Sequence, residues 1–389
     1  MSIGRIAFFQ IQEKHEGGKK VLWKRLSLRM AGARYIIYFM NEQLFILIEK
    51  LKNERKLSLE EYVFLLENRT EKVEERLAAH ARKARRAVYG QSVFIRGLIE
   101  ISNICKNDCL YCGIRKSNAD CQRYRLTLDE ILECCREGYE LGFRTFVLQG
   151  GEDGYYTDDV LSRVIGAIKE HYPDCAVTLS LGERSRNSYQ KLFDAGADRY
   201  LLRHETADAS HYGLLHPKEL SHENRMRCLK DLKDIGYQTG CGFMVGSPYQ
   251  TVEHLAKDLK FIEEFQPDMC GIGPFIPAKG TPFEKQKAGT VELCCYLLSI
   301  IRLIKPNILL PATTALGTID SFGREKGILA GANVVMPNLS PPAVRKKYNL
   351  YDNKISDGAE SAQSKDALAE RMHRIGYEIV TDRGDIRID

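Results

Sequence analysis

The chain has 389 residues, of which 44% are hydrophobic and 28% are charged, which is the composition of a folded globular protein. No apolar run reaches the roughly 18 residues that a membrane-spanning helix needs, so the sequence does not indicate a membrane protein. The net charge of +5 comes from residues 1–39, which hold eight Lys or Arg against two Glu, a net charge of +6. The remainder therefore has a net charge of −1, which argues against a nucleic-acid partner.

Residues 1–39 have neither the long apolar core nor the small-residue cleavage site of a secretory signal. We interpret them as a basic extension upstream of a translation start at Met40. A genuine additional arm and an organellar transit peptide are the less favoured interpretations. The chain holds 12 cysteines, including two adjacent pairs in helix-like runs. Adjacent cysteines rarely form a disulfide, so we expect free thiols and a cytoplasmic location.

After a helical lead-in over residues 40–92, short β-rich runs alternate with amphipathic helical runs. This alternation indicates parallel pairing and predicts an α/β fold, a (β/α)8 TIM barrel over residues 93–345. A partly open barrel of six strands is the alternative, and residues 346–389 are expected to close the barrel. The β-rich runs cover residues 94–102, 146–152, 176–183, 199–205, 238–246, 269–277, 308–315 and 333–338.

Polar and glycine-rich residues gather at the ends of these runs. The cysteine loop follows the first run, Gly-Gly-Glu-Asp the second, and Arg-His-Glu-Thr ends the fourth. In a parallel barrel the carboxyl ends of the strands meet at one face, and active sites form there. The sequence therefore predicts an active site at this face.

The stretch ISNICKNDCLYCGI holds Cys105, Cys109 and Cys112 in a C-x3-C-x2-C spacing. Structural zinc usually takes four ligands, and a ferredoxin-type cluster takes four cysteines. Three thiolates on a cubane of four irons leave one iron open to a small chelating molecule. A zinc site and ordinary buried cysteines are the alternatives.

This motif, with Tyr111 before its last cysteine, resembles that of the radical S-adenosylmethionine (SAM) superfamily. The resemblance implies one 4Fe-4S cluster held by the three cysteines, and reductive cleavage of SAM to a 5′-deoxyadenosyl radical. Glycines let a ligand approach the backbone closely, and arginine suits a carboxylate; for the arginines, surface salt bridges are the alternative. The residues matching the SAM site are Tyr111, Gln149, Gly150, Gly151, Glu152, Arg203, Glu205 and Arg225.

Within the superfamily the chain resembles the biotin synthase-like group and, more closely, the HydE-type maturases of FeFe-hydrogenases. The segments DRYLLRHETA, GIGPFIP and PATTA carry this likeness. It implies assembly of the dithiolate-bridged di-iron part of the H-cluster from an iron carbonyl cyanide cysteine precursor. It also implies HydG- and HydF-like partners and a reductant such as ferredoxin or flavodoxin. The residues matching the substrate region are Thr178, Arg199, Thr313, Thr314, Met336, Tyr348 and Tyr351.

Short and charged residues at strand ends predict a polar cavity rather than a packed barrel core. A buried arginine needs an anionic partner, and no spare strand-end carboxylate is apparent for Arg199, so we expect it to bind an anionic substrate. In the alternative, the threonines only satisfy strand ends and the tyrosines pack in the core. Residues 346–389 hold no cysteine, which excludes the second cluster that many HydE chains carry there.

Three other activities compete with the maturase. A mutase of the 3-methylornithine synthase type shares the barrel and the cluster motif. Biotin synthase is disfavoured because it needs further cysteines in the barrel, and a ferredoxin-like electron carrier needs a fourth cysteine ligand.

Overall fold

The computed structural model describes residues 40–355 and 361–387. The prediction that residues 1–39 form an extension before Met40 lies outside the described residues. Within them, no helix combines the length and the apolar composition that crossing a membrane requires.

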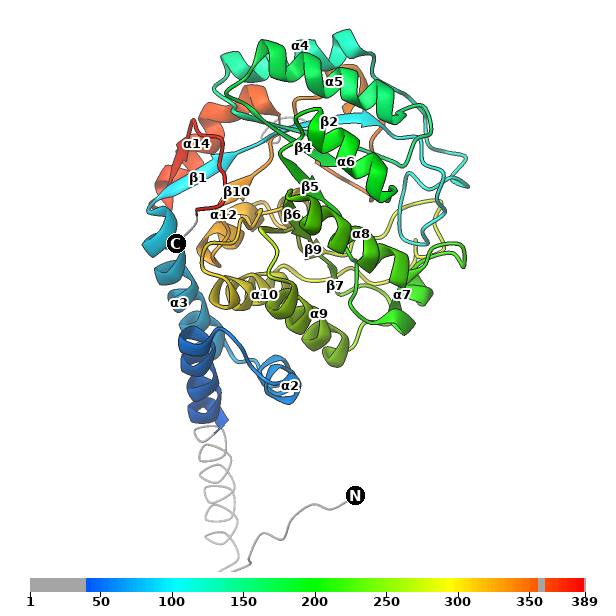
Figure 1. Cartoon of the computed structure of the whole chain (residues 1–389). Helices are drawn as coiled ribbons and strands as arrows, with labels where there is room; N and C mark the ends of the chain where they lie inside the picture. The colour runs from blue at the N-terminus through cyan, green and yellow to red at the C-terminus, as the bar shows by residue number, and fades with distance from the viewer. Residues whose placement is uncertain (1–39, 356–360, 388–389) are drawn as a thin grey trace, which may run out of the picture.

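The centre of the molecule is a ring of parallel strands (Figure 1). A six-stranded sheet runs in the order β2-β3-β4-β5-β6-β8. Parallel bridges from Met269 to Leu309, from Pro311 to Val334 and from Leu98 to Asn338 then close the ring. The predicted barrel is confirmed, although its seventh strand consists only of these bridges. The strands are β1 (Ser92–Ile95), β2 (Gly97–Ser102), β3 (Thr145–Gly150), β4 (Ala176–Ser180), β5 (Arg199–Leu201), β6 (Gln238–Cys241), β7 (Met244–Val245), β8 (Met269–Cys270), β9 (Gly273–Pro274), β10 (Val334–Val335) and β11 (Glu378–Val380).

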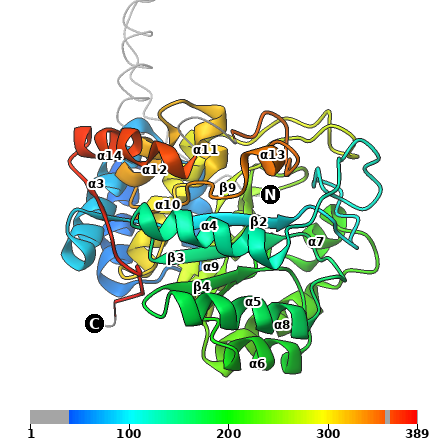
Figure 2. The same ribbon diagram turned by 90° about the horizontal axis from the view of Figure 1, so that it is seen from above.

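Helices cover the outside of the ring, as the view from above shows for α4, α5, α6 and α8 (Figure 2). Several begin at a Ser or Thr whose side chain accepts a backbone N–H, as Thr127 does before α4. The lead-in comprises residues 40–54, α2 and α3, and α3 packs against α10. The helices are α2 (Leu59–Glu67), α3 (Glu71–Tyr89), α4 (Leu128–Glu140), α5 (Asp158–His171), α6 (Arg186–Asp194), α7 (Ala209–Leu215), α8 (His222–Ile235), α9 (Val252–Phe265), α10 (Val291–Ile304), α11 (Thr314–Ile319), α12 (Gly323–Leu329), α13 (Pro342–Arg345) and α14 (Lys365–Arg374), with a short 3-10 helix at Ala362–Ser364.

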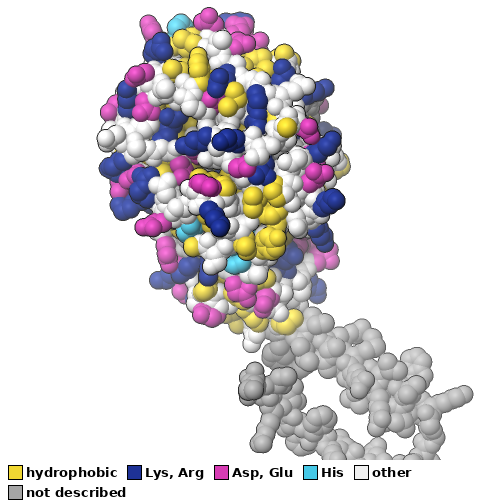
Figure 3. Space-filling view, turned by 90° about the vertical axis from the view of Figure 1, so that its right-hand side faces the viewer, with side chains coloured by type: hydrophobic (Ala, Val, Ile, Leu, Met, Phe, Trp, Pro, Cys, Tyr) yellow, Lys and Arg dark blue, Asp and Glu magenta, His cyan; other side chains and the backbone are white. Residues whose placement is uncertain are grey.

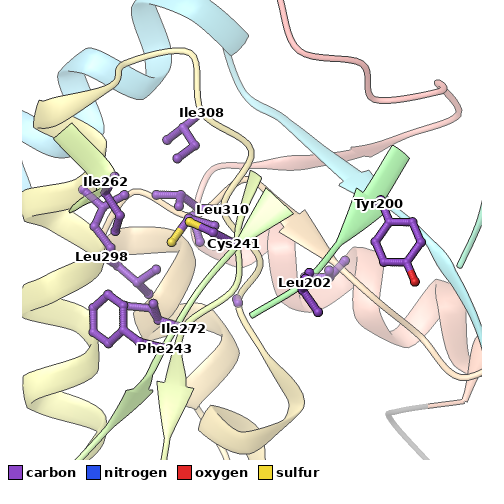
Figure 4. Close-up of a cluster of buried hydrophobic side chains, with 14 of the residues drawn as sticks. Tyr200, Leu202, Cys241, Phe243, Ile262, Ile272, Leu298, Ile308 and Leu310 are labelled. Carbon is purple, nitrogen blue, oxygen red and sulfur yellow. The ribbon is translucent and has the colours of Figure 1, made fainter. Parts of the chain in front are cut away.

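The hydrophobic core lies between the strands and this outer layer of helices. Phe243 and Leu310 from the ring meet Ile262 of α9 and Leu298 of α10, and all four are fully buried (Figure 4). Burying one such side chain contributes about 1.5–3 kcal/mol to the stability of the fold. This packing holds the strands in place and leaves their carboxyl ends to build a site.

The C-terminal residues reach the opposite end of the ring. Strand β11 pairs in parallel with β1, and the residues after it pass under the amino ends of the strands. There the Arg383 carbonyl accepts a hydrogen bond of 2.7 Å from the Thr145 hydroxyl, and Asp385 accepts one of 2.8 Å from the Gln238 amide. Residues 381–387 therefore cover the amino end of the barrel.

Candidate active site

The carboxyl ends of the strands surround a cavity of about 330 Å³. Fifteen of the eighteen residues predicted for the cluster, SAM and the substrate region are polar or cysteine, and the cavity wall brings together sixteen of the eighteen. Those sixteen are Cys105, Cys109, Tyr111, Cys112, Gln149, Gly150, Gly151, Glu152, Arg203, Glu205, Arg225, Thr313, Thr314, Met336, Tyr348 and Tyr351.

The cysteine loop lies between β2 and α4, and hydrogen bonds hold its backbone. The Arg123 guanidinium donates to the carbonyl of Asn103 at 2.6 Å and to that of Arg115 at 2.6 Å. Gly113 donates its N–H to the Leu350 carbonyl at 2.8 Å, which ties the loop to the C-terminal segment. The loop is thus fixed in place by the rest of the chain.

The three thiols of this loop are partly buried. Burial raises the pKa of Cys112 to about 12 and also raises that of Cys105 and Cys109. A thiol binds metal as the thiolate, so these thiols need the positive charge of iron to ionise at neutral pH. No three His, Cys, Asp or Glu side chains of the described residues are grouped as ligands of one metal ion.

The Gly-Gly-Glu segment after β3 lies against the cysteine loop. A side chain at Gly151 would place its Cβ 2.3 Å from the Ile104 carbonyl oxygen and 2.8 Å from the Cys105 Cβ. Only glycine permits this approach. Glu152 accepts a hydrogen bond of 3.0 Å from the Glu183 N–H, while its Oε2 atom has no hydrogen-bond partner among the described residues. The segment thus presents a carboxylate oxygen next to the cysteines.

Arg203 and Glu205 follow β5 on the same wall. Arg203 Nη2 lies 3.2 Å from Glu205 Oε2, but Nε and Nη2 of Arg203 and Oε2 of Glu205 make no hydrogen bond to any described residue. Glu205 has a φ of 65°, in the left-handed region that non-glycine residues rarely adopt. Such strain costs about 1–3 kcal/mol and is concentrated at ligand sites. This pair offers unused donors and acceptors to a ligand with both charges.

Arg225 is buried in α8 and is not the surface salt bridge considered as its alternative. Its Nε lies 2.6 Å from a Glu183 carboxylate oxygen, and its Nη1 donates to the Arg203 carbonyl at 2.5 Å. These contacts fix the backbone at Arg203. Nearby, the Tyr111 hydroxyl lies 3.2 Å from His216 Nε2. Arg225 thus holds the wall in position and completes it.

Residues from the last two strands and the C-terminal segment form the other wall. Thr313 precedes α11 without using its side chain as a cap, and its buried hydroxyl finds no partner among the described residues. The Tyr348 hydroxyl accepts a 3.4 Å hydrogen bond from the Gln149 amide. With Thr314, Met336 and Tyr351, these groups line a region that combines hydroxyls with apolar surface.

Arg199 and Thr178 are the two predicted residues that the structure does not bring to this wall. Arg199 opens β5 at the amino end of the ring, and its guanidinium donates to Asp385 at 2.5 Å, to Thr145 at 3.0 Å and to the Arg383 carbonyl at 2.7 Å. The prediction that Arg199 has no carboxylate partner is therefore wrong, because residues 381–387 supply one. Thr178 pairs in register with Arg199, two residues before Ser180 of the cavity wall.

Comparison with known proteins decides the family. The model of the radical SAM superfamily matches residues 99–262. The FeFe hydrogenase maturase subunit HydE of Thermotoga maritima is 48% identical to this chain over 281 residues, 72% of this chain and 80% of that protein. This chain belongs to the HydE family of radical SAM proteins.

Other relatives share the fold of this HydE-family chain. The 3-methylornithine synthase of Methanosarcina acetivorans is 29% identical over 85% of this chain and 92% of its own length. The crystal structure of methylornithine synthase (PylB) superposes with a TM-score of 0.77 at 28% identity, covering 86% of this chain and 97% of that one. The maturase HydG, at 22% identity and a TM-score of 0.72 over 88% of this chain and 78% of that one, shows the fold alone.

The cavity of the HydE-family chain fits a 4Fe-4S cluster and SAM, the cofactors of radical SAM proteins. Its three partly buried thiols sit on one fixed loop. Gly151 leaves room beside Cys105, and Arg203 and Glu205 keep polar atoms without hydrogen bonds to described residues, while Glu152 Oε2 lies 3.1 Å from the Lys106 ammonium. Buried polar atoms without partners carry an energetic cost that a polar ligand would remove.

Two charged residues of the wall, Glu100 and Lys354, were missed by the sequence analysis. Glu100 is a fully buried carboxylate within β2, and Lys354 is the last but one residue of the segment YNLYDNKI. The signal available was a Glu inside an otherwise apolar strand run, because a buried charge requires a partner.

Proposed function

We propose that this chain is a radical SAM maturase that acts in assembly of the FeFe-hydrogenase H-cluster. The observation that carries the proposal is the 48% identity to the T. maritima HydE over 281 residues, 72% of this chain. In this proposal the substrate is an iron carbonyl cyanide complex bound to cysteine, and the product is a sulfur-bridged di-iron unit on the way to the dithiolate-bridged subcluster.

The residues of the cavity divide into two groups in this proposal. Cys105, Cys109 and Cys112 hold the cluster. The wall formed by the residues after β3 and β5, here called the first wall, holds the charged groups of SAM through Arg203 and Glu205. When bound, cluster and SAM together supply a 5′-deoxyadenosyl radical. The SAM-binding set is Tyr111, Gln149, Gly150, Gly151, Glu152, Arg203, Glu205 and Arg225.

The second wall holds the substrate next to SAM. The Thr313 and Thr314 hydroxyls can donate hydrogen bonds to an anionic group, and Met336, Tyr348 and Tyr351 enclose it. Enclosure by side chains keeps bulk water from a reactive intermediate. Arg199 plays no part in this arrangement, because its partners lie at the other end of the barrel.

The proposal also includes partners and a location. We propose HydG- and HydF-like maturases and an electron donor such as ferredoxin or flavodoxin; the cytoplasmic location stays a prediction. On the face shown in Figure 3, cationic and anionic side chains are interspersed.

The decisive experiment is a maturation assay with inactive hydrogenase, the other maturases and a reductant. We expect hydrogenase activity to require both this protein and SAM, and to be lost with Cys109→Ser. A mutase is the second candidate, favoured by the TM-score of 0.77 to methylornithine synthase. Conversion of lysine to 3-methylornithine by the purified protein, without hydrogenase activation, would overturn the maturase proposal.

A further inference from the structure

A buried ion pair lies in the substrate wall, between β2 and the C-terminal segment. The Lys354 ammonium contacts a Glu100 carboxylate oxygen, and the two side chains are 6% and 0% exposed. The second oxygen of Glu100 accepts a 2.9 Å hydrogen bond from the Asn338 amide. Glu100 is therefore held from two sides, and it fixes the position of the Lys354 ammonium.

Lys354 retains one donor for a ligand. A lysine ammonium has three N–H donors. One points to Glu100, and another donates to the Tyr348 carbonyl at 2.9 Å. Since Lys354 also lines the cavity, the third donor can serve a molecule bound there.

The Tyr348 ring lies beside this ammonium, which sits 4.9 Å from the ring centre, and its hydroxyl group belongs to the same wall. That hydroxyl accepts a hydrogen bond from Gln149, so its own proton is available to a ligand. Burial raises the pKa of Tyr348 well above its ordinary value, and the hydroxyl stays protonated. Two donors from neighbouring groups match the two oxygens of a carboxylate.

A role in anchoring the C-terminal segment does not by itself explain a charged pair here. Burying two charges costs free energy that apolar residues of similar size avoid, so a buried pair is weak support for a stability role. The other cations of the cavity wall lie on the side assigned to SAM, where Arg225 pairs with Glu183 and Arg203 pairs with Glu205. Lys354 is the cation placed among the substrate-wall residues.

We propose that Lys354 and the Tyr348 hydroxyl bind the carboxylate of an amino-acid substrate, with Glu100 holding the ammonium in place. This inference rests on the proposed function and specifies its substrate class: the iron complex is recognised through the carboxylate of its cysteine. Glu100 balances the charge of Lys354 when no ligand is bound. The one remaining Lys354 donor and the Tyr348 hydroxyl together suit a single carboxylate.

The test compares two ligands that differ only in the carboxylate, S-methyl-L-cysteine and 2-(methylthio)ethylamine. Their dissociation constants are measured by calorimetry on the cluster-containing protein saturated with SAM. We expect the wild type to bind S-methyl-L-cysteine at least roughly tenfold more tightly, the factor typical of a charged hydrogen bond. In Lys354→Met this preference should disappear.

Arg371→Met is the matched control, because it removes a C-terminal ion pair with Glu325, at 2.6 Å, that lies outside the cavity. It should keep the wild-type preference for the carboxylate. Equal preference in Lys354→Met and wild type, no preference in wild type, or binding of neither ligand would overturn the inference. A wild type that discriminates the ligands but activates no hydrogenase would remove the proposed function and leave the carboxylate site standing.

Discussion

Each end of the barrel holds an arginine, but the two differ in burial and in partners: the Arg199 side chain is fully buried, and that of Arg203 is 34% exposed. At the amino end, Arg199 donates to Asp385, Thr145 and the Arg383 carbonyl. At the carboxyl end, Arg203 keeps Nε and Nη2 without hydrogen-bond partners among the described residues. The first arginine is satisfied by the chain itself, whereas the second has an ion pair with Glu205 at 3.2 Å and keeps hydrogen-bond donors that a ligand can use.

Whether the chain supplies all the hydrogen-bond partners of a charged side chain distinguishes a stabilising residue from a ligand-binding residue better than burial does. A buried polar atom without a hydrogen-bond partner is costly, and a bound molecule can supply the partner. The residues that stabilise the fold thus lie at the amino ends of the strands, and those that bind a ligand lie at the carboxyl ends, as is usual for parallel barrels. The following variants test that division.

Cys109→Ser should have the largest effect, and it should be confined to the carboxyl end of the barrel, here called the open end. Loss of one of three ligands should abolish the 4Fe-4S absorption and reduce SAM cleavage below detection. Cys121→Ser is the control, because Cys121 lies nearby with its sulfur 3.5 Å from the Asn103 amide but outside the motif. Iron content of about four per chain in Cys121→Ser and near zero in Cys109→Ser is expected; a normal cluster in Cys109→Ser contradicts the three-ligand site.

Arg199→Met should destabilise the amino end of the barrel, here called the closed end because residues 381–387 cover it. The change removes the partner of Asp385, and we expect a loss of about 3 kcal/mol in the free energy of unfolding, the low end for a broken buried pair. The low end applies because Asp385 is 38% exposed and can regain water. SAM affinity, measured at a temperature where the variant is folded, should stay within about twofold. A stable variant that lost SAM binding would place Arg199 in the active site.

Gly151→Ala should disturb the open end through backbone crowding. A Cβ there would lie 2.3 Å from the Ile104 carbonyl, so the cysteine loop must shift, at about 1–3 kcal/mol for an overpacked site. Gly154→Ala is the control, because its Cβ would meet nothing within 4 Å. We expect reduced iron retention after gel filtration only in Gly151→Ala. Equal retention in both variants would show that the loop yields without cost.

Arg203→Met should weaken SAM binding about tenfold, because it removes a charged donor from the ligand. It should lower the free energy of unfolding by no more than about 1 kcal/mol, because the ion pair with Glu205 that it removes is partly exposed at Arg203. Equilibrium dialysis of SAM and chemical unfolding measure the two quantities. A strongly destabilised variant with unchanged SAM affinity would reverse the assigned roles of the two ends.

The sequence analysis predicted the barrel and most of the cavity wall because both follow from local patterns. Alternating β-rich and helical runs indicate parallel strands, and strand ends meet at one face. The error at Arg199 has a local cause: it opens the run that Arg203 and Glu205 close, and four residues of strand span about 13 Å. Position within the run should have separated them.

The partners of these residues were beyond sequence reasoning. Asp385 lies 186 positions after Arg199, and Lys354 lies 254 after Glu100. Neither belongs to a periodic run, so no pattern indicates which strand it meets. Strand β11 was missed for the same reason, since its pairing with β1 depends on how the C-terminal segment folds back.

The smallest expected effect is the pH dependence of the closed end. Burial by itself raises the pKa of Asp385, but Arg199, Gln238 and Arg383 outweigh it and lower the pKa well below its usual range. Arg96, buried beside this group, adds positive charge, while Asp198 holds Arg383 from the other side. The folded protein therefore keeps Asp385 ionised in mildly acidic solution.

Because the pKa is lower in the folded protein, Asp385 stabilises the fold above its unfolded pKa of about 4, and this stabilisation is lost as the pH falls below that value. The unfolding midpoints of wild type and Asp385→Asn should differ by a constant amount between pH 7 and pH 5. The difference should shrink below about pH 4, where the unfolded chain takes up a proton that the folded chain still refuses. Removing iron from both proteins beforehand excludes any contribution from acid loss of the cluster. A difference that grows on acidification would mean that Asp385 is protonated more readily in the folded state, and Arg199 would then lack the anionic partner that closes this end of the barrel.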